Sequence, residues 1–146
     1  MKRILSSTLA LIVFSLSIGC SSSNNDTPPL SCGRQAEIIN QTTFDQVNIT
    51  NYMITNVALN VDCLDITISS SGCNANNWDM NLFSTSAFSS TSIAQKQLKI
   101  ELINEEACLA VFQKTVSFSL IPYRIDGHNE INLIIQGWST PINYTY

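Results

Sequence analysis

The sequence has little charge and few of the residues that mark disordered chains. Only 12% of its 146 residues are charged, about half of the roughly 25% usual in soluble domains. Five glycines and four prolines are too few for a collagen-like or a Pro/Gly-rich disordered chain. Seven basic residues against eleven acids, a net charge of −4, leave no basic face for phosphates, so we expect no nucleic-acid partner.

Histidine is also scarce. His128 is the single histidine, which removes most zinc sites and most His-based catalytic arrangements. We therefore expect no metal, no cofactor and no enzymatic activity. Ser, Thr, Asn and Gln must supply most of the polar surface, and the length allows one domain.

The N-terminus has the features of an export signal. Lys2 and Arg3 precede an apolar stretch, residues 5–18, which is shorter than the roughly 20 residues of a membrane-spanning helix. Small residues follow it. This pattern predicts a secretory signal peptide over residues 1–19.

The residues at the end of this signal predict a lipid anchor. Leu16-Ser17-Ile18-Gly19-Cys20 resembles the lipobox of bacterial lipoproteins, although the usual Leu lies one position early. The resemblance implies cleavage before Cys20 and acylation of this cysteine, with palmitate among the acyl chains. Ser21 in place of Asp implies the outer membrane by the same resemblance. The alternative is an ordinary secretory signal with an incidental cysteine.

Residues 20–30 contain almost no apolar side chains and predict a flexible tether. A single domain is expected over residues 31–146. There, apolar and polar residues alternate with the period of two that predicts β-strands, and only residues 35–46 could be helical. We expect an all-β fold, an antiparallel, disulfide-stabilised β-sandwich, immunoglobulin-like or similar, with about seven strands.

The alternation also predicts which side chains face inward. One strand precedes Leu64, where the phase flips and a bulge or strand break is expected. Asn104, Glu105 and Glu106 predict a hairpin-like turn in which the two acids are only solvated. The expected inward sets are Thr55, Val57, Leu59, Val61 and Cys63; Leu64, Ile66 and Ile68; Trp78, Met80 and Leu82; Leu98, Ile100 and Leu102; Val116, Phe118 and Leu120; and Ile131, Leu133 and Ile135.

Four cysteines remain after Cys20, an even set that favours two disulfides in an exported chain. These are Cys32, Cys63, Cys73 and Cys108. Three pairings are possible. A local Cys63–Cys73 bridge with Cys32–Cys108 is slightly favoured, and a Cys63–Cys108 bridge between sheets is an alternative. Their spacing contains no CxxC pair, which argues against a metal site.

Several short segments resemble those of small lipid-anchored β-sandwich proteins from Bacteroidota. The resemblance implies the fold and the location and transfers no activity. Similar proteins often carry a histidine after the Ser-Gly-Cys turn, whereas this chain has asparagines there. The segments are Asp62-Cys63-Leu64-Asp65-Ile66, Ser71-Gly72-Cys73, Cys108-Leu109-Ala110, Phe118-Ser119-Leu120-Ile121-Pro122 and Tyr144-Thr145-Tyr146.

Few residues suggest chemistry. His128 lies near Asp126 but has no nucleophile motif beside it, so it is expected to be an exposed turn residue. Asp62, Asp65 and Asp79 could converge on calcium, but their spacing fits no known calcium loop and solvated acids are favoured.

Several aromatic residues lie near expected strand ends or the terminus: Tyr52, Trp78, Tyr123, Trp138, Tyr144 and Tyr146. The candidate ligand-binding residues among them are Trp78, Trp138, Tyr144 and Tyr146. Exposed rings beside Asn and Gln suit sugars and proteins, while Trp78 and Trp138 could instead fill the core. We expect a non-catalytic binding or accessory module, with a surface protein or a glycan as partner. The alternatives are an inhibitor of a secreted protease or glycosidase, and a small hydrolase with paired carboxylates.

Overall fold

The computed structural model describes residues 32–146. The predicted signal peptide, the lipidation at Cys20 and the tether lie outside the described residues. In chain order the elements are β1 Arg34–Gln35, β2 Glu37–Ile38, α1 Gln41–Gln46, β3 Met53–Asn60, β4 Cys63–Gly72, η1 Ala75–Asn77, β5 Asp79–Ser84, β6 Ala94–Ile103, β7 Ala110–Ser119, η2 Ile121–Tyr123, β8 Glu130–Ile135 and β9 Ile142–Thr145.

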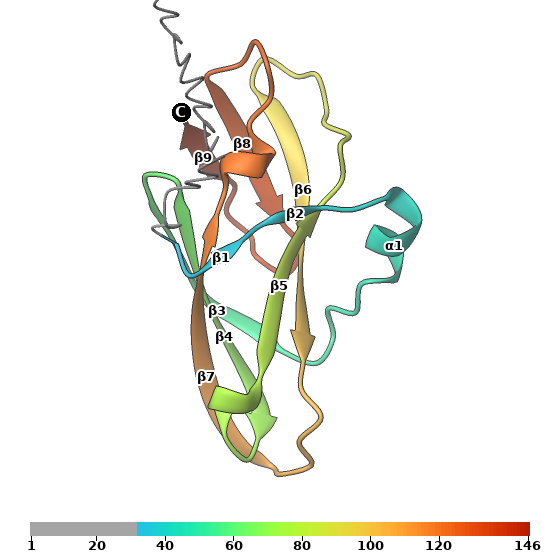
Figure 1. Ribbon diagram of the computed structural model, residues 1–146, viewed down its shortest axis with the longest axis vertical. Helices are drawn as coiled ribbons and strands as arrows, with labels where there is room; N and C mark the ends of the chain where they lie inside the picture. The colour runs from blue at the N-terminus through green and yellow to red at the C-terminus, as the bar shows by residue number, and fades with distance from the viewer. Residues whose placement is uncertain (1–31) are drawn as a thin grey trace, which may run out of the picture.

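These strands form two sheets in a sandwich-like, nearly all-β arrangement (Figure 1). One sheet has the order β1-β7-β4-β3 and the other has the order β2-β5-β6-β8-β9. The predicted fold class is thus confirmed, but the sheets are mixed rather than purely antiparallel. Three pairs are parallel, namely β1 with β7, β2 with β5 and β6 with β8.

The N-terminal segment accounts for two of the parallel pairs, because the chain passes from one sheet to the other between β1 and β2. Arg34 and Gln35 pair with β7, and Glu37 and Ile38 pair with β5. Ala36 between them is buried, and its N–H donates to the Ser119 carbonyl at 3.0 Å. The ambiguous segment at residues 35–46 therefore contains the last residue of β1, the strand β2 and the short helix α1.

Most of the predicted inward faces are confirmed. The alternating residues of β4, β5, β6 and β8 are buried at or near 0% exposure and form one core with Phe118 and Leu120. Burial of such apolar surface is the main favourable term in folding. Two predicted inward residues of the first long strand are wrong. Thr55 is exposed and Ile54 is buried in its place, because the register shifts between Ile54 and Asn56, and Val61 is 85% exposed.

Val61 lies in a tight turn rather than on a strand. Asn60 pairs with Cys63, so Val61 and Asp62 alone connect β3 to β4. Val61 has a φ of 53°, which β-branched residues rarely adopt. The phase flip in the sequence thus corresponds to this strand break.

The connection after β6 does not form the predicted hairpin. β6 belongs to the five-stranded sheet and β7 to the four-stranded sheet, so residues 104–109 cross between sheets. Short alternating segments indicate strands but do not show which sheet each one joins.

Both disulfides are present, but their pairing differs from the favoured one. Cys32 bonds to Cys63, and Cys73 bonds to Cys108. A Cys63–Cys73 bridge is wrong because β4 fully separates these residues. A strand of ten residues is roughly 30 Å long at about 3.3 Å per residue. The two disulfides therefore lie at opposite ends of β4.

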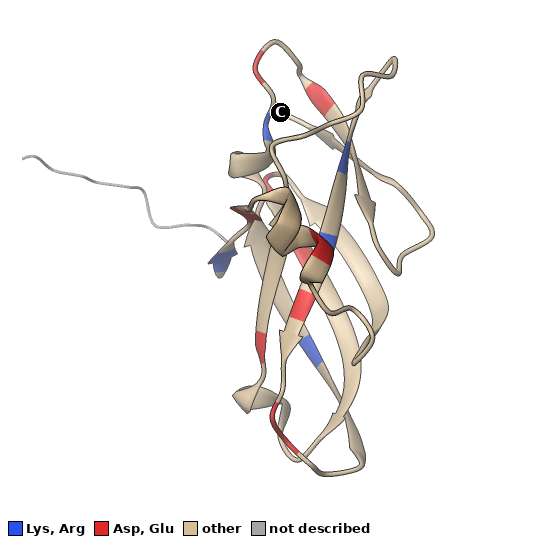
Figure 2. Cartoon of the chain, turned by 90° about the vertical axis from the view of Figure 1, so that its right-hand side faces the viewer, with Lys and Arg blue, Asp and Glu red and all other residues tan. Residues whose placement is uncertain are grey.

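The surface of the described chain carries few charges. Figure 2 shows the Lys, Arg, Asp and Glu residues of this part scattered over the elements rather than gathered in a broad patch of one sign. Within residues 32–146, no helix is long and apolar enough to cross a membrane.

Candidate functional site

Two of the four candidate aromatic residues are buried, so the prediction that they offer rings to a ligand is corrected. Trp78 is 2% exposed and Tyr144 is 0% exposed. Both lie at inward positions of the alternation, and both polar atoms have partners within the protein. Trp78 Nε1 donates to Glu106 at 3.1 Å, and Tyr144 Oη donates to Asp62 at 2.6 Å.

The other two aromatic residues, Trp138 and Tyr146, are half-buried and pack against the core. The Tyr146 hydroxyl accepts a hydrogen bond from the Ile125 N–H at 2.8 Å, which ties the chain end to the loop after η2. Trp138 Nε1 is buried without a hydrogen-bond partner among the described residues. The four candidates therefore do not form one shared surface.

Asp62 is the centre of a polar cluster beside the β3–β4 turn. Its Oδ1 accepts from Arg124 at 2.6 Å and from Tyr144 at 2.6 Å, and Arg124 Nε donates to Tyr144 Oη at 3.0 Å. The Tyr144 hydrogen bond is the largest cause of the lowered pKa of Asp62. Burial is the largest cause of the raised pKa of Tyr144, which is about 12. This cluster fastens the C-terminal strand to the turn.

The acids considered for calcium have separate partners. Asp79 forms an ion pair with Arg34 at 2.5 Å, and Asp65 accepts from Asn60 at 3.0 Å. In the part of the chain that the structure describes, no three His, Cys, Asp or Glu residues gather closely enough to hold a metal ion. His128 is exposed. Its ring lies edge to face against that of Phe88, with 5.9 Å between the ring centroids.

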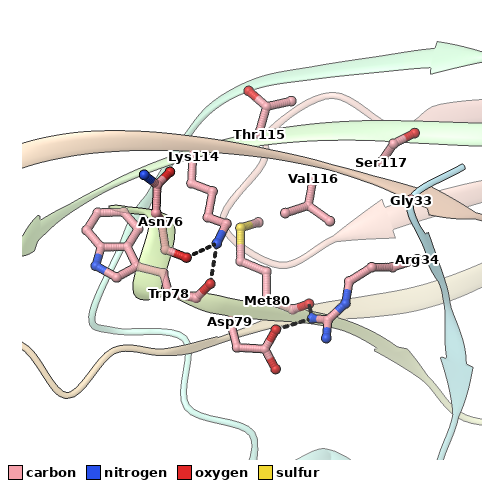
Figure 3. A pocket seen from close by; sticks show the side chains of 10 residues that line it. All are labelled: Gly33, Arg34, Asn76, Trp78, Asp79, Met80, Lys114, Thr115, Val116 and Ser117. Atoms are coloured by element: carbon pink, nitrogen blue, oxygen red, sulfur yellow. Dashed lines mark hydrogen bonds and ion pairs between the residues drawn. The ribbon is translucent and has the colours of Figure 1, made fainter. Parts of the chain in front are cut away.

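A first cavity of about 460 Å³ lies between β5 and β7, and we call it the edge cavity (Figure 3). Two cations reach across it. Lys114 of β7 donates to the Trp78 carbonyl, and Arg34 of β1 donates to the Met80 carbonyl. It is lined by Gly33, Arg34, Asn76, Trp78, Asp79, Met80, Lys114, Thr115, Val116 and Ser117.

The edge cavity is explained by sheet structure. β2 pairs with β5 only at Phe83 and Ser84, which leaves the start of β5 as an open edge. Its outward carbonyls accept from Lys114, Arg34 and, at Leu82, the Tyr123 hydroxyl. Side chains, and lysine above all, commonly protect open edges in this way. The cations of this cavity are therefore already bound to the backbone.

A second cavity of about 570 Å³ lies near the Cys73 end of β4, and we call it the end groove. Most of its lining is polar and uncharged. It is lined by Thr50, Asn51, Tyr52, Met53, Ser69, Ser70, Ser71, Asn104, Glu106 and Val111.

Glu106 organises one wall of the end groove. Its Oε2 accepts from the backbone N–H groups of Cys73 at 2.7 Å and Asn74 at 2.9 Å and from Trp78 Nε1. Its Oε1 accepts from Asn77 Nδ2 at 3.0 Å. The Asn74 N–H is the largest cause of a pKa lowered to about 2. The expectation that Glu106 is only solvated is thus wrong.

Gly72 makes this arrangement sterically possible. A Cβ atom at this position would lie 2.6 Å from Glu106 Oε2 and 2.9 Å from the Trp78 ring. In proteins a Cβ atom essentially never lies within 3.0 Å of a heavy atom to which it is not bonded through the chain. Glycine is the residue that permits such close approach.

The opposite wall is held by the segment before β3. Tyr52 Oη donates to the Ile100 carbonyl at 2.7 Å, and Asn51 Nδ2 donates to the Leu102 carbonyl at 3.0 Å. These bonds satisfy the half of β6 that extends beyond β8. Burial raises the pKa of Tyr52 to about 12, so its hydroxyl stays protonated and keeps donating.

Lys96 is a further residue that the sequence did not single out. It lies on the inward face of β6, 2% exposed, and Nζ donates to the Thr85 carbonyl at 2.7 Å. Burial lowers its pKa. An inward lysine between Ala94 and Leu98 interrupts the apolar alternation, and this interruption is the signal that could have revealed it.

Comparisons with known proteins give a structural likeness alone. No protein-family model matches the chain, and no curated protein matches its sequence. A solved structure from Bacteroides vulgatus, described as a protein of unknown function DUF1344, is similar with a TM-score of 0.51 and 15% identity. The similarity covers 77% of this chain and 55% of that one, so the chain spans about half of that structure's length. At this identity the likeness shows the fold alone.

Proposed function

We propose that the protein is a lipoprotein, anchored through Cys20 to the outer membrane, that acts as a non-catalytic binding or accessory module. The observation that carries this proposal is the position of the end groove. Cys32, the first described residue, is fixed to Cys63 at one end of β4, and the groove lies near Cys73 at the other end. A tether that joins at Cys32 would hold the groove away from the membrane.

The groups around the end groove favour binding over catalysis. Glu106 is the one acid among its lining residues, and four N–H groups donate to it. Hydrolysis by paired carboxylates needs a second acid across the site. The lining residues contain no histidine that could activate a serine.

The anchor is tested by labelling. The full chain should incorporate radiolabelled fatty acid and fractionate with the outer membrane, whereas Cys20→Ala should incorporate none and become soluble. Equal labelling of the two chains, or a membrane fraction unchanged in Cys20→Ala, would contradict the anchor.

The binding role is tested with the full chain on a glycan array and on outer-membrane extract, where it should retain a ligand.

A specific observation supports inhibition of a secreted protease or glycosidase as a second candidate. Leu109 is 91% exposed and directly follows the disulfide-bonded Cys108. A rigid loop with a protruding apolar residue suits insertion into an enzyme cleft, since little entropy is lost on binding. Inhibition of secreted hydrolases by the full chain, abolished by Leu109→Asp, would favour this candidate.

A further inference from the structure

From the chemistry of the end groove we infer that it binds a neutral, hydroxyl-rich ligand, a short uncharged oligosaccharide, and that Ser69, Ser71 and Asn51 form its hydrogen bonds. This inference rests on the proposed binding function and adds the ligand class.

The charges of the groove favour a neutral ligand. No Lys or Arg is among its lining residues, so an anionic ligand finds no countercharge there. The single carboxylate, Glu106, already accepts four hydrogen bonds from N–H donors, so a cation would have to displace them. A neutral ligand that binds through uncharged hydrogen bonds needs no countercharge and displaces none of these donors.

Three polar side-chain groups of the groove are free for such a ligand. Among the described residues, the hydroxyls of Ser69 and Ser71 and the side-chain oxygen of Asn51 have no hydrogen-bond partner, while Asn51 Nδ2 is held by Leu102 and its backbone carbonyl by Ser70. Hydroxyls both donate and accept, and an amide oxygen accepts. Sugar hydroxyls can satisfy all three groups.

The positions of these groups are fixed before the ligand arrives. Ser69 lies on β4 between Met53 of β3 and Gln113 of β7, and Ser71 pairs with Val111 of β7. Asn51 is held by two hydrogen bonds, at 2.6 Å and 3.0 Å. A pre-organised site loses less entropy on binding.

Apolar side chains flank the two serines. Met53 pairs with Ser69 and is 66% exposed, and Val111 pairs with Ser71 and is 73% exposed. Pockets for small ligands combine apolar walls with a few fixed polar groups. The C–H faces of a pyranose ring can contact Met53 and Val111 while its hydroxyls reach the serines.

An extended peptide fits the groove less well. Peptides that add to a sheet need unpaired backbone groups at an edge. The Ser69 backbone lies between β3 and β7, and beyond the end of β3 the Ser71 carbonyl already accepts from Asn104 Nδ2 at 2.8 Å. Recognition at this point must therefore use side chains.

The inference is tested by calorimetry on the full chain in detergent. The probes are neutral tetrasaccharides of glucose, mannose and galactose, with the anionic tetragalacturonate for comparison. We expect saturable binding of a neutral probe. Ser69→Val and Ser71→Val should each weaken it about two- to tenfold, as expected for one lost hydrogen bond.

Matched variants separate a lost contact from a damaged fold. Ser117→Val, on β7 outside the groove, should bind as the unchanged chain does, and Ser71→Thr, which keeps a hydroxyl, should retain most of the affinity. Each variant is checked by thermal unfolding.

Two results would overturn the inference: no neutral tetrasaccharide binds at millimolar concentration, or tetragalacturonate binds as tightly as the best neutral probe. If the chain then retains a protein from outer-membrane extract, the oligosaccharide is wrong and the proposed binding function stands. If the array and the extract also yield no ligand, both fail.

Discussion

Glu106 shows how a single loop residue can fix the geometry of one end of this protein. Its carboxylate joins the turn after β4, the η1 segment and the Trp78 ring through four hydrogen bonds. Hydrogen bonds to a charged acceptor are stronger than those between neutral groups. The same carboxylate forms a wall of the end groove, so the stability of this end and the shape of the groove depend on one residue.

We expect Glu106→Gln to lower the melting temperature by several degrees at pH 7, because an amide accepts these hydrogen bonds less well. The folded pKa of Glu106 is about 2, below the ordinary value of 4.5. The contribution of the ionised carboxylate to the free energy of unfolding is therefore complete above pH 4.5 and is lost as the pH falls towards 2. Melting temperatures from pH 2 to pH 7 should show the two chains converging at low pH.

The control for this prediction is Glu105→Gln, since Glu105 is exposed and forms no hydrogen bond through its side chain among the described residues. This variant should melt close to the unchanged chain at every pH. A Glu106→Gln protein as stable as this control would contradict the role assigned to Glu106.

Lys96 has the opposite effect on stability, because its charge is buried and has no acidic partner within residues 32–146. Its folded pKa is lowered from 10.5, so the charged form disfavours folding at neutral pH, and this cost disappears as the pH rises to 10.5. We expect Lys96→Met to raise the free energy of unfolding by about 1 kcal/mol at pH 7, as replacing buried charges often does. Urea unfolding should show the gain shrinking towards pH 10, and a loss of stability at pH 7 would refute it.

At the scale of the elements, β4 organises the molecule. It pairs with β3 and β7, supplies Leu64, Ile66 and Ile68 to the core, and carries a disulfide at each end. The two bridges enclose similar sequence separations, 31 and 35 residues. Their effects on stability should therefore be similar, although their effects on the groove should differ.

We expect a Cys73→Ser/Cys108→Ser double variant and a Cys32→Ser/Cys63→Ser double variant to lose about 3–4 kcal/mol each, from the chain entropy that each bridge removes. Denaturant unfolding measures this loss. Only the first variant should also loosen residues 104–109, as faster amide exchange there. Exchange that is equally fast in both variants would contradict a local role for the Cys73–Cys108 bridge.

The sequence predicts these elements well where local pattern decides them. The period of two identified the inward residues of β4, β5, β6 and β8, because alternation is a property of each strand alone. It did not predict the disulfide pairing or the crossing of residues 104–109, because both depend on which sheet each strand joins.

The end groove was not predicted for the same reason. The four donors to Glu106 lie 28 to 33 positions earlier in the chain, and no local motif links them to it. The aromatic candidates failed differently. Trp78 and Tyr144 occupy inward positions of the alternation. These positions favour burial in the core, and both side chains are buried there.

For the whole molecule, the surroundings of the two ends of β4 differ in character (Figure 1). The end with the β3–β4 turn contains Cys32, the Asp62–Arg124–Tyr144 cluster and the C-terminal strand. The other end contains the groove, the Cys73–Cys108 bridge and the protruding Leu109. We propose that the first end faces the membrane and that the second faces the ligand.

Site-specific crosslinking in the cell envelope tests this polarity most directly. A photo-reactive amino acid replaces Leu109 in one full chain and Val61 in another. These positions are matched, since they are 91% and 85% exposed and lie near opposite ends of β4. The account predicts adducts with a non-lipid envelope component from position 109, and lipid adducts or none from position 61. Lipid adducts at 109 with ligand adducts at 61 would contradict it.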